Sequence, residues 1–148
     1  MDSLEGYVMN KLPTESVLQF EGYEVNHLHF DMIKEPLVDK EFQIQPNFEV
    51  SLTNNPEGLY SVMLSLEIKG SDNNPLPFEL KVIMTGKFTI CMKSENDELK
   101  EALLRQNTVA IMFPFLRSIV ASLTTAANIT PLILPIVNLA EAFENESG

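Results

Sequence analysis

The chain has 148 residues, of which 45% are hydrophobic, and its 21 acidic and 10 basic side chains give a formal net charge of −11. This length favours one domain with a sizeable core, and the composition excludes a largely disordered chain. The negative charge excludes DNA or RNA as the main partner, since phosphate binding requires a positive field. Cys91 is the only cysteine, so the sequence holds no disulfide framework and no cysteine-based zinc site. The first residues lack the features of a secretory signal peptide, and we expect a cytoplasmic protein.

Four segments in the first two thirds of the chain predict β-strands, because apolar and polar residues alternate along them. The segments are residues 16–33, 42–53, 58–69 and 77–92. Such alternation is typical of strands that bury one face and expose the other. Turn-forming residues at 54–58 and 70–75 connect the later strands, so we expect neighbouring strands to be antiparallel. In the first strand the alternation slips near Gly22, as a β-bulge would produce.

A helical period replaces this alternation after the fourth strand. Residues 94–97 fit a capping box, which predicts a short helix reaching about Leu104. A second, longer helix is predicted over about 107–127, because apolar residues recur there at spacings of three and four. Pro114 lies inside this helix and removes one backbone hydrogen bond, so we expect a kink or a position near the helix N-terminus.

An unusually apolar segment follows the predicted helix. Two prolines within residues 130–137 prevent it from being helical throughout, and we expect an extended crossover loop. Asn138 is a typical N-cap for a short last helix that reaches Phe143. We expect residues 1–14 and 144–148 to be flexible.

Together these elements predict an α+β fold: a four-stranded antiparallel sheet with one long helix packed on it, a crossover loop and a short C-terminal helix. The helix is apolar on more than one side and covers only part of the sheet, so we expect a homo-oligomer. The uncharged residues 118–137 are numerous enough to span a membrane. Their two prolines and their polar side chains favour a buried helix and a loop instead, and we expect no membrane insertion.

No enzyme motif is present in the sequence. The chain has neither a glycine-rich nucleotide-binding motif nor a GxSxG nucleophile motif, so we predict no catalytic residue and no cofactor. His27, His29 and Asp31 fall on one side of the first strand, where they could hold a metal ion. Exposed polar residues on an outer strand explain the same spacing, and we predict no metal site.

Two short motifs stand out in the last third of the chain. Residues 112–117 read Met-Phe-Pro-Phe-Leu-Arg, and residues 135–138 read Pro-Ile-Val-Asn at the end of the apolar crossover. Residues 45–50 and 86–90 carry the further sequences QPNFEV and GKFTI. These segments resemble the helix, turn and strand motifs of the SecB protein-export chaperones, and the resemblance covers about residues 16–143.

The resemblance implies a dimer of dimers that acts as an ATP-independent holdase, keeping unfolded preproteins or another aggregation-prone client in apolar grooves. In this chain the implied groove combines strand, crossover and last-helix residues. Its members are Phe48, Val50, Leu52, Ile129, Leu132, Ile133, Leu134, Leu139 and Phe143. The same strand residues could instead form the core under the long helix.

In the SecB family an acidic outer sheet face docks the motor protein SecA, and the matching positions here are His27, Asp31, Glu79 and Lys81. Asp31 keeps the acidic character, whereas Glu79 puts a charge where an apolar contact is expected and Lys81 reverses a charge. Client binding is therefore a firmer expectation than docking to SecA. Three alternatives stay open: a dedicated chaperone of an antitoxin-type client, a non-chaperone oligomer and a carrier of a small apolar ligand.

Overall fold

The computed structural model describes residues 17–33, 44–55, 58–91, 97–129 and 132–134. The predicted last helix, the two predicted flexible ends, and the groove residues Leu139 and Phe143 lie outside these ranges. The crossover is described for residues 132–134.

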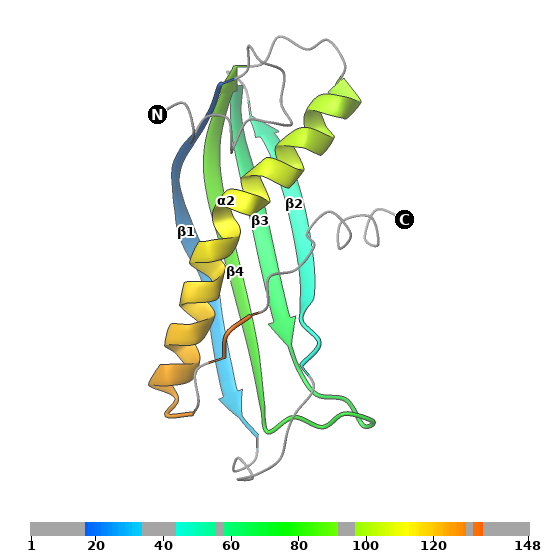
Figure 1. The fold of residues 1–148 in the computed structure, drawn as a ribbon, viewed down its shortest axis with the longest axis vertical. Helices are drawn as coiled ribbons and strands as arrows, with labels where there is room; N and C mark the ends of the chain where they lie inside the picture. Colours follow the sequence, from blue (N-terminus) through cyan, green and yellow to red (C-terminus); the bar gives the residue numbers. More distant parts are fainter. Residues whose placement is uncertain (1–16, 34–43, 56–57, 92–96, 130–131, 135–148) are drawn as a thin grey trace.

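Four strands form one antiparallel sheet. They are β1 (Val17–Met32), β2 (Asn47–Asn55), β3 (Leu59–Ile68) and β4 (Phe78–Cys91). Their order across the sheet is β1-β4-β3-β2, so β1 and β2 are the edge strands (Figure 1). The predicted strands are confirmed, with one correction: β2 begins at Asn47 and not at residue 42. Pro46, just before it, has no N–H with which to extend the pairing.

β1 is irregular at two places. Its register with β4 shifts just before Gly22, where the sequence predicts a bulge, and again between Val25 and His27. Gly22 has a φ of 119°, a conformation that other residues rarely adopt. At the second shift, Thr85 Oγ1 donates a 2.6 Å hydrogen bond to Asn26 Oδ1. Each shift moves the alternation by one residue, so the two together return the later apolar residues of β1 to the core side.

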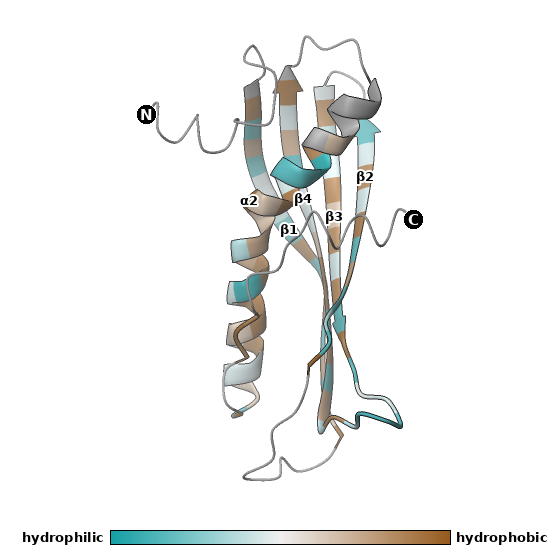
Figure 2. Ribbon diagram, turned by 45° about the vertical axis from the view of Figure 1, so that its right-hand side comes forward, coloured by the Kyte–Doolittle hydropathy of each residue, from teal (hydrophilic) through white to brown (hydrophobic). Residues whose placement is uncertain are grey.

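A single continuous helix, α2 (Asp97–Ala126), is found where the sequence predicts two. Asn107, the expected start of the second helix, is buried inside α2, and the Thr108 hydroxyl donates a 2.7 Å hydrogen bond to the Leu104 carbonyl oxygen. The intervening sequence contains neither glycine nor proline, so the backbone hydrogen bonding continues through it. The helix also continues through Pro114, and its axis changes direction near its middle, in agreement with the predicted kink (Figure 2).

The core lies between α2 and one face of the sheet. α2 packs mainly on β4 and β3 (Figure 1), whose inward residues are almost fully buried. The largest buried side chains of these strands are Phe88, Leu64, Leu66, Ile68, Leu80 and Met84. A side chain on Gly86 would meet the Met112 sulfur at 2.7 Å, so glycine at this position allows α2 to lie close to β4.

The segment Leu104–Ala126 of α2 is long and apolar enough to cross a membrane, by length and composition. The core helix of a globular domain can have the same composition. In the structure Val109, Met112 and Leu116 are buried in the core cluster that α2 forms with the sheet. The apolar character of this helix is therefore used, in part, for packing on the sheet.

Candidate functional site

The face of the sheet under α2 is covered unequally from edge to edge. The inward residues of β3 and β4 are buried, whereas nearly all of those on the edge strands β1 and β2 are half-buried or exposed. Two apolar margins result. We use the name β2 margin for the apolar side chains of β2 together with Ile129 and residues 132–134, all on the same face of the sheet, and the name β1 margin for the surface formed by β1 and the neighbouring side of α2.

On the β2 margin the three strand residues of the predicted groove differ in burial. Phe48 is a core residue, and its ring centroid lies 6.0 Å from that of Phe113 on α2. Val50 and Leu52 are half-buried and pack against the edge of the core. The strand therefore contributes one side chain to the core and two to the open margin.

The described part of the crossover returns over the same face of the sheet, beside α2 (Figure 1). Its three side chains lie in different surroundings. Leu132 is half-buried, Ile133 is 61% exposed and Leu134 is fully buried in the core. Ile129, at the end of the helix, is half-buried as well. The predicted groove residues of the crossover therefore divide into a buried anchor, an exposed side chain and two at the boundary.

Hydrogen bonds at the end of α2 fix the start of the crossover. Asn128 has a φ of 64°, and its amide donates a 3.0 Å hydrogen bond to the Thr125 carbonyl oxygen. The Ile129 amide donates a 3.2 Å hydrogen bond to the Thr124 carbonyl oxygen, which completes a Schellman motif. The buried Thr124 hydroxyl then accepts a 2.9 Å hydrogen bond from the Leu132 amide. Ile133 is therefore presented from a backbone that is attached to the helix.

The β1 margin contains a hollow of about 360 Å³ between β1 and α2. It is lined by Leu28, Ser118, Ile119, Ser122, Leu123 and Ala126. Leu28 is 52% exposed although it lies opposite Val82 and faces the core side of the sheet. On the same strand and helix, the exposed side chains of Tyr23 and Phe115 have ring centroids 4.9 Å apart. This margin is an apolar surface built entirely from a strand and a helix.

Sequence reasoning did not identify the β1 margin as a surface. The spacing of Leu28 along its strand, and of Ile119 and Leu123 along their helix, predicts that they are core residues. The sequence did contain one indication of this surface. Ser118, Ser122 and Ala126 are small and spaced four residues apart, so they lie on one side of the helix.

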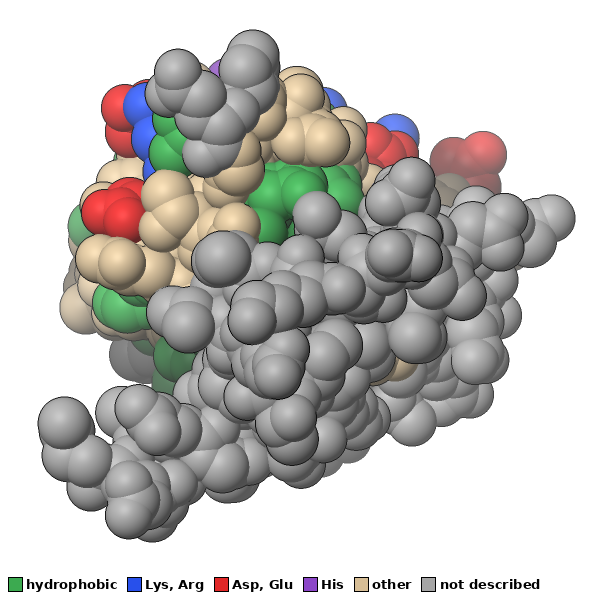
Figure 3. All heavy atoms as spheres, turned by 90° about the horizontal axis from the view of Figure 1, so that it is seen from above, with side chains coloured by type: hydrophobic (Ala, Val, Ile, Leu, Met, Phe, Trp, Pro, Cys, Tyr) green, Lys and Arg blue, Asp and Glu red, His purple; other side chains and the backbone are tan. Residues whose placement is uncertain are grey.

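The opposite face of the sheet carries charged side chains, and charged side chains are visible along the upper part of Figure 3. The register of β1 with β4 pairs His29 with Lys81 and Asp31 with Glu79. His27 lies on the same face, and all five side chains are exposed or half-buried. The four positions predicted from the resemblance to the SecA-docking face are therefore neighbours on one surface.

Comparison with known proteins links this chain to one family. The family model described as preprotein translocase subunit SecB matches residues 13–147. The protein-export protein SecB of Neorickettsia sennetsu is 30% identical over 122 residues, which cover 77% of this chain and 71% of that protein. An uncharacterized protein of Methanocaldococcus jannaschii is 27% identical over 136 residues, covering 90% of this chain and 86% of that protein.

A solved structure shows the same fold. The SecB-like chaperone of Mycobacterium tuberculosis, in complex with a peptide from an antitoxin, matches with a TM-score of 0.68 and 15% identity, covering 81% of this chain and 90% of that one. The predicted fold class, a four-stranded antiparallel sheet with one long helix, is thereby confirmed.

Proposed function

The chain belongs to the SecB family, which supports a chaperone role in export or client binding, and we propose that it is an ATP-independent holdase. It binds unfolded or extended client polypeptides in the cytoplasm and performs no catalysis. The observation that carries this proposal is the β2 margin. There a highly exposed apolar side chain, Ile133, lies on a segment whose backbone is hydrogen-bonded to α2.

The proposed groove uses side-chain contacts in preference to backbone pairing. Val50, Leu52 and Ile133 offer partly exposed apolar surface, whereas Phe48 and Leu134 are buried in the core. A client can place alternate apolar side chains against this surface while its backbone stays in water, which gives low sequence specificity. Leu139 and Phe143 belong to the proposed groove by their resemblance to the family and lie outside the described residues.

We also propose that the chain forms a homo-oligomer, a dimer of dimers, through the β1 margin. β1 has 16 residues, and no strand of the described part of the chain pairs with its outer edge. An open strand edge is a template for another chain, and Leu28 and Phe115 add exposed apolar surface beside it. A second copy of this chain covers both features at once.

Two kinds of client are compatible with the proposed holdase role. Unfolded preproteins fit the export role of the family, and an antitoxin-type client fits the peptide bound to the M. tuberculosis chaperone of the same fold. SecA docking on the outer face is a separate proposal. The neighbouring carboxylates of Asp31 and Glu79 favour a basic partner there, whereas Lys81 opposes it.

The experiment that tests the holdase role uses two matched variants. Ile133→Asp places a charge on the β2 margin, and Leu59→Asp places one at an exposed apolar position of β3, on the opposite face. We expect the wild-type protein to suppress aggregation of a chemically unfolded protein without ATP. Loss of a well-packed apolar contact should weaken the client affinity of Ile133→Asp by about tenfold or more, and Leu59→Asp should behave like wild type. Light scattering should give the same mass for all three proteins.

The double variant Leu132→Asp with Ile133→Asp should weaken client binding further at unchanged mass. Unaltered client affinity in this variant contradicts the groove assignment. If an oligomer of normal mass never suppresses aggregation, the protein is a structural oligomer. Tight stoichiometric binding of one lipid-like molecule, with no affinity for unfolded protein, identifies a carrier.

A further inference from the structure

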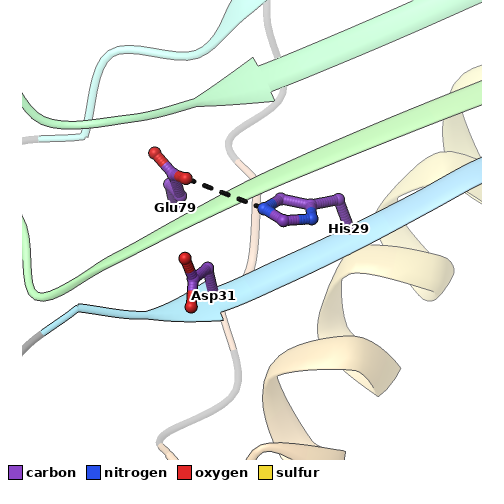
Figure 4. A group of neighbouring side chains, drawn as sticks. All are labelled: His29, Asp31 and Glu79. Carbon is purple, nitrogen blue, oxygen red and sulfur yellow. Dashed lines mark ion pairs between the residues drawn. The ribbon is translucent and has the colours of Figure 1, made fainter.

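Three side chains of metal-binding type lie together on the outer face of the sheet, near the end of β1. They are His29, Asp31 and Glu79, and one ligand atom from each lies within 4.8 Å of the others (Figure 4). His29 Nε2 is 3.6 Å from Glu79 Oε1. The sequence alone predicted no metal site on this strand, but the fold adds Glu79 from β4, and we propose that these three residues form a binding site for a divalent transition-metal ion of the Zn²⁺ class.

The charge arrangement favours a cation at this position. Asp31 lies directly opposite Glu79 on the same face of the sheet, and like charges placed opposite one another destabilise strand pairing. Asp31 forms no ion pair with any lysine or arginine that the structure describes. A divalent cation bound between the two carboxylates replaces their repulsion with attraction to a shared ion.

The donor set and the backbone suit zinc. Zinc accepts imidazole nitrogen and carboxylate oxygen ligands at about 2.0–2.2 Å, so its ligand atoms lie about 3–4 Å apart. His29 and Asp31 are two residues apart on β1, beyond its second bulge, and therefore point to the same side. The ligand atoms need to approach by only about an ångström from their present separation, which exposed side chains can do by changing rotamer.

Two neighbours make the proposal specific to these three residues. His27, which shares their face, lies opposite Ile83 and further from the carboxylates, with its ring centroid 6.4 Å from that of His29. It is therefore a matched control for a histidine that is not a ligand. Lys81 lies opposite His29, and its positive charge opposes a bound cation.

The test is a calorimetric titration of the metal-free full chain with Zn²⁺. We expect one main site per chain. His29→Ala, Asp31→Asn and Glu79→Gln should each weaken binding by at least about tenfold, since even outer-shell partners of metal ligands contribute about 10–100-fold. His27→Ala should change the affinity by less than about threefold, and Lys81→Gln should raise it by up to about threefold through the loss of a repulsive charge.

Any of three results overturns the proposal. The first is no zinc binding up to millimolar concentration, and the second is an equal loss of Zn²⁺ affinity in His27→Ala and His29→Ala. The third is an unchanged Zn²⁺ affinity in both Asp31→Asn and Glu79→Gln. Circular dichroism without zinc checks that each variant is folded. A second measurement needs no variant. In NMR spectra of the wild-type chain, Zn²⁺ should shift the ring signals of His29 and the backbone signals around Asp31 and Glu79, and shifts confined to other residues contradict the site.

Discussion

The two apolar margins of the sheet differ in how they are built. The β2 margin includes a crossover segment, where Ile133 is exposed next to the buried Leu134 in the chain and the backbone is attached to α2 through Thr124. The β1 margin is made of regular secondary structure, with a hollow between α2 and the edge strand β1, whose outer edge pairs with no strand among the described residues. β1 and β2 are both edge strands, but β1 is the longer, with 16 residues against 9. The longer edge with its adjacent apolar surface suits a lasting contact with another copy, whereas exposed side chains on a crossover suit a client that must be released.

Both margins have one geometric cause. A four-stranded sheet is about 15–20 Å wide, and an α-helix with its side chains is about 10–12 Å wide. A helix placed over β4 and β3 therefore cannot cover the edge strands. The chain leaves apolar residues on both edges, and the two edges differ only in what the rest of the chain adds to them.

The first prediction compares two neighbouring crossover residues, of which one stabilises the core and the other is exposed in the proposed groove. Leu134→Ala removes a fully buried side chain and should lower the free energy of unfolding by about 2–5 kcal/mol. Ile133→Ala removes an exposed one and should change it by no more than about 0.5 kcal/mol. Chemical denaturation at equal protein concentration measures both, and equal losses would show that the two side chains are not divided between core and groove.

The second prediction tests whether the margins have different roles. Leu28→Asp with Phe115→Asp puts two charges on the β1 margin, where they would be buried against another copy. The dissociation constant of the oligomer should rise by at least about 100-fold, because an unpaired buried charge is costly. Light scattering across a dilution series measures it, with Ile133→Asp as the control of normal mass. If Ile133→Asp dissociates the oligomer and the β1 variant does not, the roles of the two margins are exchanged.

A smaller effect is expected where the crossover is attached to the helix. Thr124→Val keeps the shape of the side chain and removes the acceptor for the Leu132 amide, which should cost about 1–2 kcal/mol of stability. Thr125→Val is the matched control, because its exposed hydroxyl bonds to Ala121 and not to the crossover. Hydrogen exchange at the Leu132 amide should become faster in the first variant alone. Unchanged exchange there would mean that the crossover is held by its side chains.

The smallest effect is expected at the end of the helix. Asn128 adopts a left-handed conformation that asparagine and glycine tolerate better than other residues. Asn128→Ala should lower the free energy of unfolding by about 0.5–1 kcal/mol, whereas Asn128→Gly should leave it unchanged or raise it. Thermal unfolding of the two variants checks the order. The reverse order would show that the Asn128 side chain, and not its backbone conformation, ends the helix.

Local patterns in the sequence predicted most of the fold. Alternation identified four strands, the slip at Gly22 identified a bulge, and the motif around Pro114 indicated the family. Each of these signals lies within a few neighbouring residues, because the pleat of a strand and the turn of a helix repeat over that distance. The break predicted before Asn107 was wrong, since burial of that residue and the hydrogen bond of Thr108 favour a continuous helix.

The residue pattern along each strand and helix sets which of its sides is apolar. Which of those apolar side chains stay exposed depends on packing, because a helix narrower than the sheet can cover only some of them. Glu79 joins His29 and Asp31 through a register between strands some 50 residues apart in the chain. The hollow beside Leu28 likewise requires the positions of both β1 and α2. Such pairings come from packing between distant segments, which no local periodicity encodes.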